Sequence, residues 1–350
     1  MKSDTPTAPN TGETKTTLPP QEPPLPATTE SMQRRAAHSS DDAVKRWCSI
    51  NGISSEQFVQ RAHLVFRLEA FQASIPSHDL SIARFFTGLT ELFVVHQRGI
   101  SSLNGVQHLS NLTTLYLNEC GLTAMGPALQ GCRRLKTLHL CNNDIQKIEN
   151  LDNLPELEIL WLCQNQITQI EGLSKCPKLR VLWLASNRIE NILTGLDDNL
   201  QLAELNMAAN KVGEFKQVLN LSRCKTLRTL FFSDPHYGEN PMCNLCNYQT
   251  FVLYHLKQLT ALDSMYISRE SKQLAEATYT KKMMFEFVGQ TKGGGKEKWE
   301  PDPSDRVIGS EVSQVSQVSQ VSQVSQVSQG SEYTVKTMQK AMDGNNNVAA

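Results

Sequence analysis

Residues 157–167, LEILWLCQNQI, return almost unchanged at residues 179–189 as LRVLWLASNRI, and residues 135–145 read LKTLHLCNNDI. All three fit the pattern L-x-x-L-x-L-x-x-N-x-L/I, which recurs along the chain every 22 to 25 residues. A unit of this length cannot bury its own apolar face, so we expect neighbouring units to stack around one shared core. The first leucine of the pattern lies at Leu89, Leu112, Leu135, Leu157, Leu179, Leu202 and Leu227.

The pattern and its period resemble the leucine-rich repeat in its short form of about 22 residues. This resemblance implies an α/β solenoid of about seven repeats over residues 89–263, with a parallel sheet on its concave side. The residue at the ninth place of each repeat should lie inside, where an amide side chain satisfies backbone groups of a sharp turn. That place is held by Gln97, Cys120, Asn143, Asn165, Asn187 and Asn210.

The segments that flank the repeats predict caps and tails. Residues 41–88 are predicted to be a helical N-terminal cap: one helix ends at Asn51-Gly52, and a second begins at Ser54. The last repeat closes in a C-terminal cap, and a further helix is predicted over residues 264–290. Low apolar content predicts disorder for residues 1–40 and 291–350, and six Val-Ser-Gln triplets fill residues 312–329 of the second tail.

Composition limits the classes of function. Lys plus Arg is 34 and Asp plus Glu is 35, so the net charge of -1 argues against a binder of nucleic-acid phosphates or anionic membranes. No apolar run is long enough to span a bilayer, and the N-terminus lacks the apolar region of a signal peptide. Nine cysteines without paired spacing also favour a reducing compartment. We therefore expect a cytoplasmic monomer that binds neither membrane nor nucleic acid.

No catalytic or metal-binding pattern stands out. Cys132, Cys176 and Cys224 each precede a repeat leucine by three residues, a core position where a thiol packs as a small hydrophobe. Cys243 and Cys246 have zinc-like spacing, but a structural zinc site needs four ligands. We therefore predict no cofactor, no bound metal and no enzymatic activity, and we expect these two cysteines to pack in the C-terminal cap.

One column of residues predicts a binding surface. Side chains alternate across a strand, so the residue between the second and third leucines of each repeat should point outward from the concave sheet. The column holds more aromatic residues than the preference of aromatic residues for strands explains. Exposed Trp and Tyr are favoured anchors for a protein partner. Strand preference, or coverage by the chain's own tails, remains the alternative. The column reads Phe93, Tyr116, His139, Trp161, Trp183, Asn206 and Phe231.

The end of the repeats gives a more specific resemblance. Residues 234–263, DPHYGENPMCNLCNYQTFVLYHLKQLTALD, and residues 275–286, AEATYTKKMMFE, resemble the first repeat block of the family of leucine-rich-repeat-containing protein nine. That family is associated with ciliated and flagellated cells, and its members continue into coiled-coil and further repeat blocks. The resemblance, which covers roughly residues 41–290, implies a scaffold for ciliary or flagellar (axonemal) proteins. The wider repeat class includes a regulator of protein phosphatase 1, so a regulatory subunit that holds a phosphatase catalytic subunit is the alternative.

Overall fold

The computed structural model describes residues 41–54, 62–72, 80–193 and 195–291. The described residues up to residue 284 belong to one compact unit, which contains every element described here and the last helix as far as residue 284. The predicted disordered tails, most of the predicted helix from Ser54 and the Val-Ser-Gln triplets lie outside the described residues.

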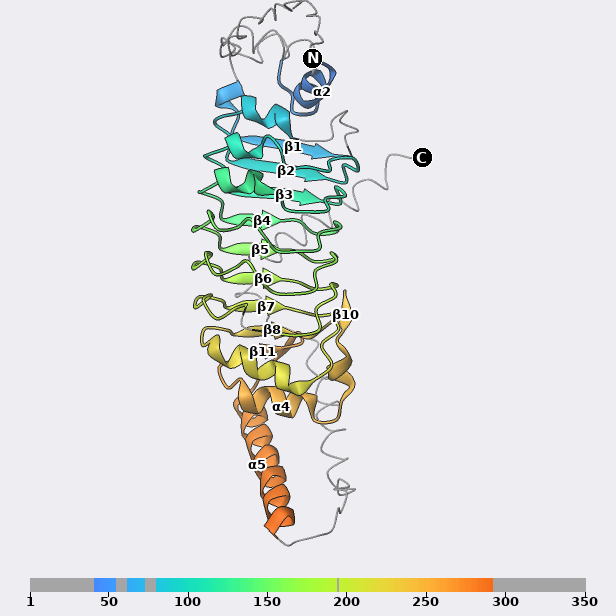
Figure 1. Ribbon diagram of the computed structural model, residues 1–350, viewed down its shortest axis with the longest axis vertical. Helices are drawn as coiled ribbons and strands as arrows, with labels where there is room; N and C mark the ends of the chain where they lie inside the picture. The colour runs from blue at the N-terminus through green and yellow to red at the C-terminus, as the bar shows by residue number, and fades with distance from the viewer. Residues whose placement is uncertain (1–40, 55–61, 73–79, 194, 292–350) are drawn as a thin grey trace, which may run out of the picture. The chain divides into compact units, whose positions relative to one another are not determined.

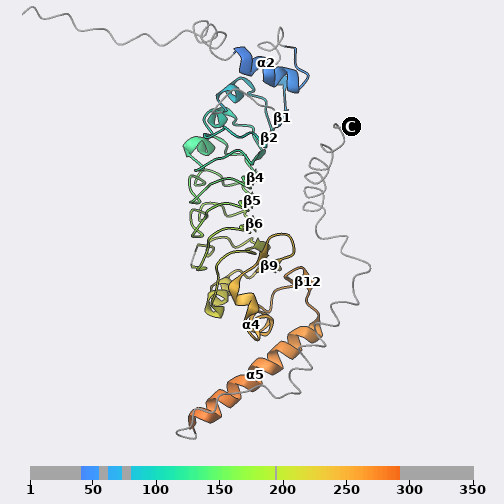
Figure 2. The same ribbon diagram turned by 90° about the vertical axis from the view of Figure 1, so that its right-hand side faces the viewer.

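A stack of short parallel strands forms one side of the molecule (Figures 1 and 2). The sheet follows the chain in the order β1-β2-β3-β4-β5-β6-β7-β8-β11, and β12 closes it as an antiparallel edge. The α/β leucine-rich-repeat solenoid predicted from the sequence is thereby confirmed. The strands are β1 (Arg67–Phe71), β2 (Glu91–Val95), β3 (Thr114–Asn118), β4 (Thr137–His139), β5 (Ile159–Trp161), β6 (Val181–Trp183), β7 (Glu204–Asn206), β8 (Thr229–Phe231), β11 (Ala261–Leu262) and β12 (Met265–Tyr266).

Short 3-10 helices return the chain on the opposite side of the stack (Figure 2). Between the two sides, the leucines of the L-x-x-L-x-L pattern are fully buried in one continuous core. At one of these returns the backbone segments lie so close together that only glycine fits. Gly105 has φ +107°, and a Cβ there would lie 2.0 Å from the Leu80 carbonyl oxygen. The 3-10 helices are η2 (Ala62–Leu64), η3 (Ser81–Phe85), η4 (Val106–His108), η5 (Pro127–Gly131), η6 (Phe215–Arg223) and η7 (Pro241–Asn244).

The predicted asparagine ladder is present inside the stack. Asn165 shows the pattern: its Oδ1 accepts the Ile145 N–H at 3.0 Å, and its Nδ2 donates to the Leu140 and Leu162 carbonyls at 2.9 and 3.0 Å. Asn240 makes the equivalent bonds at the C-terminal end, although it lies outside the regular repeat pattern. Each amide thus satisfies donors and acceptors of two neighbouring turns, which is why the turns can be buried.

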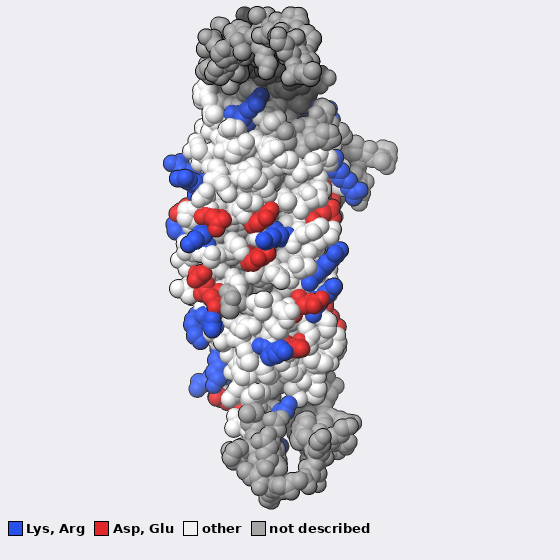
Figure 3. Space-filling model, viewed as in Figure 1, with Lys and Arg blue, Asp and Glu red and all other residues white. Residues whose placement is uncertain are grey.

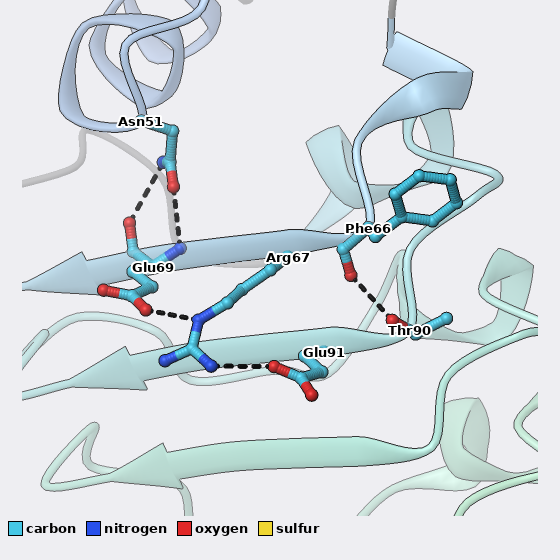
Figure 4. A network of polar contacts seen from close by, with 6 residues as sticks. All are labelled: Asn51, Phe66, Arg67, Glu69, Thr90 and Glu91. Carbon is cyan, nitrogen blue, oxygen red and sulfur yellow. Dashed lines mark hydrogen bonds and ion pairs between the residues drawn. The ribbon is translucent and has the colours of Figure 1, made fainter. Parts of the chain in front are cut away.

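The N-terminal end corrects one sequence prediction. Helix α2 (Asp41–Ile50) forms as expected, but residues 67–71 of the predicted helical cap are strand β1, which pairs in parallel with β2. The Asn51 side chain receives the Glu69 N–H at 2.8 Å and donates to the Glu69 carbonyl at 3.0 Å (Figure 4). This amide occupies the backbone groups of Glu69 on the outer edge of β1, groups that could otherwise pair with another strand.

The C-terminal end is closed by irregular elements. A two-stranded hairpin, β9 (Ser233–Asp234) and β10 (Gly238–Glu239), precedes helix α4 (Tyr248–His255). Helix α5 (Arg269–Thr291) begins as predicted: the Ser271 N–H donates to the Ser268 hydroxyl at 3.1 Å. It packs on α4 through Tyr254 and Tyr279, whose rings stack at 4.0 Å.

Candidate functional site

The side chains on the outer surface of the parallel sheet form what we call the strand face. The register of the strands places the middle residue of each repeat directly beside its equivalent in the next strand. The seven residues predicted as a partner-binding column therefore do lie in one spatial column. They are Phe93, Tyr116, His139, Trp161, Trp183, Asn206 and Phe231.

Five consecutive rings of this column, Phe93 to Trp183, stack on one another, and we call them the ring stack. Centroid separations from Phe93 onward are 4.7, 4.0, 4.2 and 4.3 Å. The two tryptophan planes are only 5° apart. The separations are close to the spacing of neighbouring strands, about 4.8 Å. Because each inner ring is held between two others, the stack turns ring edges rather than ring faces toward the outside.

Burial differs along the column, and this corrects the expectation of a fully solvent-facing ridge. His139 is 1% exposed, Trp161 is 5% exposed and Asn206 is 0% exposed, so these three are parts of the packed structure. Phe93 and Trp183 are partly exposed, as are Tyr116 and Phe231. Of the seven residues in the column, a partner on this surface would contact only these four partly exposed ones.

The centre of the ring stack holds two polar nitrogens without a partner inside the protein. Trp161 Nε1 and His139 Nδ1 are both buried and accept or donate no hydrogen bond within the described residues. Burial lowers the pKa of His139 to about 3, so its imidazole is neutral at physiological pH. An unsatisfied buried donor costs about 1–3 kcal/mol, so the stack tolerates these nitrogens at a measurable energetic cost.

The indole N–H of Trp183 has a hydrogen-bond acceptor within the described residues, unlike the indole N–H of Trp161. Trp183 Nε1 donates to the Glu204 carboxylate at 2.6 Å. Burial raises the pKa of Glu204, and the bond from Trp183 opposes that rise. Glu204 and Val181 occupy the same position in neighbouring strands. Val181 therefore lies next to Trp161 in the way that Glu204 lies next to Trp183. Valine offers no acceptor.

Arg67 covers the N-terminal end of the ring stack. Its guanidinium lies 4.3 Å from the Phe93 ring centroid and binds the carboxylates of Glu69 at 2.5 Å and Glu91 at 2.8 Å (Figure 4). Arg67 was not predicted as part of this surface, because residues 41–88 were assigned to a helical cap. Val65, Leu68 and Ala70 keep the spacing of the repeat pattern and could have identified the extra strand.

Tyr237 covers the C-terminal end of the strand face. From the turn of the β9–β10 hairpin, it packs against the small residues Cys163, Ala185 and Ala208. The hairpin is also fixed by the Asn206 amide, which donates to the Asp234 carboxylate at 3.2 Å. The chain's own tyrosine therefore occupies the surface beside these small side chains. No periodic signal in the sequence marks Tyr237.

The remaining surface carries charge of both signs. The view in Figure 3 shows acidic and basic side chains interspersed along the array. Neighbouring repeats are linked by ion pairs such as Lys178–Glu156 at 2.7 Å and Lys136–Glu158 at 3.7 Å. A binder of phosphate backbones would instead carry a stripe of one sign.

Neither a metal cluster nor a membrane span is found in the part of the chain that the structure describes. No three His, Cys, Asp or Glu side chains in it are grouped to hold a metal ion. Cys243 packs partly into the core, whereas Cys246 is exposed, so the prediction that both cysteines pack in the cap is wrong for Cys246. None of the described helices combines the length and apolarity needed to cross a bilayer.

Comparison with known families agrees with the repeat and its ladder. Residues 158–289 match a model described as leucine-rich repeat, and residues 133–175 match a model of two leucine-rich-repeat copies. Together with the fold, these matches define the chain as a leucine-rich-repeat protein. Domains of this class generally mediate protein–protein interaction and are typically non-enzymatic.

Solved structures are similar to parts of this chain. Internalin C2 of Listeria monocytogenes is 21% identical, with a TM-score of 0.51 over 63% of this chain and 91% of that one. An internalin (inlF) of the same organism is 19% identical, with a TM-score of 0.49 over 61% of this chain and 58% of that one. A chain of the Drosophila melanogaster SNF/U2A' complex is 26% identical, with a TM-score of 0.38 over 42% of this chain and 83% of that one.

Proposed function

We propose that this protein is a cytoplasmic, non-enzymatic scaffold that binds a partner protein on the open part of its strand face, in cilia or flagella. The observation that carries the proposal is the ring stack. Its members Phe93, Tyr116 and Trp183 are partly exposed, and stacking already fixes their side chains. Rigid aromatic edges lose little conformational entropy when a partner covers them, which is the property of an interface anchor.

The open part of the strand face lies toward its N-terminal end. Phe71 follows the column at the end of β1 and is 46% exposed, and Val95 beside it in β2 is partly exposed. With Phe93 and Tyr116 they form an apolar area of four side chains, while Tyr237 already covers the small residues at the other end. Contiguous apolar surface of this kind usually marks an interaction site.

The cellular setting of the proposal rests on the cap segment. Residues 234–263 resemble the family associated with ciliated and flagellated cells, so axonemal proteins are the partners we expect. A phosphatase catalytic subunit is the alternative partner, by analogy with the repeat class.

The test is capture of partners from an extract of ciliated cells by the purified full chain and by a double variant, Phe93→Ala with Tyr116→Ala. Two central anchors contribute about 2 kcal/mol each, so the double variant should weaken binding of the true partner more than a hundredfold. A double variant elsewhere, Leu200→Ala with Leu219→Ala, also removes two exposed leucine side chains and should bind normally.

Mass spectrometry of the captured proteins decides between the two functions. Axonemal proteins that depend on Phe93 and Tyr116 would support the scaffold, and a phosphatase catalytic subunit would support the alternative. Equal capture by wild type and by the folded Phe93 and Tyr116 variant would reject the strand face as the docking surface.

A further inference from the structure

Two cysteines differ from four other buried cysteines in what their thiols contact. Cys141 and Cys163 touch each other on the strand face, beside the ring stack. Four other buried thiols each donate to a backbone carbonyl of the preceding repeat. These bonds run from Cys120 to Val94, Cys132 to Val106, Cys176 to Leu151 and Cys224 to Leu196.

The backbone places Cys141 and Cys163 opposite each other. His139 and Trp161 are direct partners in the parallel pair β4–β5. Cys141 lies two residues after His139, and Cys163 lies two residues after Trp161. The Asn142 N–H donates to the Cys163 carbonyl at 2.9 Å, so the two strand ends stay hydrogen-bonded at this point. Neighbouring strands lie about 4.8 Å apart, which is inside the Cα separation of about 4.4–6.8 Å that a disulfide spans.

The two cysteine residues differ in exposure. Cys141 is partly exposed, and Cys163 is buried behind it. The Cys163 side chain packs in one cluster with Cys141 and Tyr237. A small oxidant therefore reaches Cys141 first and meets a second thiol already in contact with it.

We propose that Cys141 and Cys163 form a reversible disulfide across β4 and β5 when a hydroperoxide reaches Cys141. The Cys141 thiolate attacks the terminal peroxide oxygen, the O–O bond breaks, and the sulfur becomes a sulfenic acid. The Cys163 sulfur then attacks the sulfenic sulfur; the S–S bond forms, and the oxygen leaves as water. In sum, two thiols and one hydrogen peroxide give one disulfide and two waters.

The surroundings set the rate and the consequence of this reaction. Hydrogen bonding to Cys163, and then burial, raise the pKa of Cys141 well above its ordinary value. Since the thiolate is the nucleophile, the reaction is slow and responds to sustained rather than brief oxidant exposure. The disulfide takes the Cys163 sulfur out of its present contacts, so it changes how Tyr237 and the β9–β10 hairpin sit on the strand face.

The experiment treats the folded full chain with hydrogen peroxide, blocks the remaining thiols with a maleimide and maps tryptic peptides without reduction. Trypsin separates the two residues, because residues 137–147 contain only Cys141 and residues 148–175 contain only Cys163. We expect these two peptides to appear as one linked species, two hydrogens lighter than their sum, and to separate after dithiothreitol.

Matched variants identify the pair. Cys176→Ala removes a buried thiol that bonds a carbonyl, and it should leave the link intact; Cys141→Ala or Cys163→Ala should abolish it. Unreacted thiols at both positions, sulfinic acid at Cys141 without a link, or links between other cysteines would each overturn the proposal. The wild-type map decides the question even if Cys163→Ala fails to fold, and Cys141→Ala removes the less buried member.

Discussion

The strand face has two halves that share one backbone and differ in what covers it. From β2 to β6, the middle column is a stack of aromatic rings in register, one ring from each strand. From β7 onward, the stack stops at Asn206, whose amide bonds Asp234, and Tyr237 reaches back over the small residues that follow β5, β6 and β7, which are Cys163, Ala185 and Ala208.

This difference teaches how a regular solenoid limits its own binding surface. The parallel register repeats every column, so aromatic residues at one position of the repeat must stack. The C-terminal end has no further regular repeat to cover it, and irregular segments such as the β9–β10 hairpin meet that need. The same hairpin covers part of the strand face, so the uncovered part lies at the N-terminal end.

The largest expected effect is the loss of stability on removing a ring inside the stack, compared with the loss on removing a ring outside it. Trp161→Ala should destabilise the fold by about 3–5 kcal/mol, because a buried aromatic side chain would leave a cavity between two neighbouring rings. Phe231→Ala, in the same column but partly exposed and beyond the stack, should cost clearly less. Urea unfolding of both variants measures the two costs. Equal losses would show that the two halves of the strand face are energetically alike.

The next effect is a pH dependence that belongs to the stacked half alone. The folded-state pKa of His139 is about 3, below the ordinary value of about 6.5 expected in the unfolded chain. Between these values only the unfolded state takes up the proton, so His139 lowers stability as pH falls from about 6.5 toward 3. The loss should be on the order of a few kcal/mol.

His139→Phe provides the control for this prediction, because it keeps an aromatic ring in the stack and removes the titration. Urea unfolding at pH 7, 6, 5 and 4 should show the wild type losing more stability than the variant. Parallel curves for the two proteins would mean that His139 protonates inside the folded structure and that the stack is more open than its burial indicates.

Tyr237 gives a smaller effect in the covered half. Tyr237→Ala should cost about 2 kcal/mol, since the ring packs on Cys163, Ala185 and Ala208. It should also speed alkylation of Cys163 by a maleimide in the folded protein. Tyr237→Phe keeps the ring and removes only the hydroxyl group, so its cost should be under about 1 kcal/mol. Unchanged alkylation in the Ala variant would contradict the covering role of this side chain.

The regular part of this molecule could be predicted from the sequence, and its ends could not. Asn143, Asn165, Asn187 and Asn210 occupy the ladder as expected, because repeat spacing alone determines which side chains enter the turns. The column of seven residues followed from the alternation of side chains along a strand.

Burial and the end contacts depend on distant parts of the chain, which periodicity does not encode. Trp161 and Trp183 are equivalent by pattern, yet one is 5% exposed and the other partly open, because their neighbours differ. Arg67 lies in strand β1, inside the segment 41–88 that was predicted to be a helical cap. Tyr237 reaches the strand face through an irregular turn, so only the folded structure reveals its place.

The finest distinction lies between the two tryptophans themselves. Trp161→Phe and Trp183→Phe remove the same part of the same ring from neighbouring positions in the stack, so the packing losses should be similar. They differ in one hydrogen bond: Trp161 Nε1 has no partner within the protein, whereas Trp183 Nε1 binds Glu204. Deleting the first removes an unsatisfied buried donor, and deleting the second leaves a largely buried carboxylate without its donor.

Trp183→Phe should therefore be the more destabilising of the two by about 1–2 kcal/mol, measured by urea unfolding at pH 7. A background of Glu204→Val, which gives Trp183 the neighbour that Trp161 has in Val181, should bring the two costs together, because neither indole then has an acceptor. If the gap persists in that background, it comes from ring packing and not from the bond. If no gap exists even in the wild-type background, the indole of Trp161 has an acceptor in solution, and the centre of the ring stack is accessible to water.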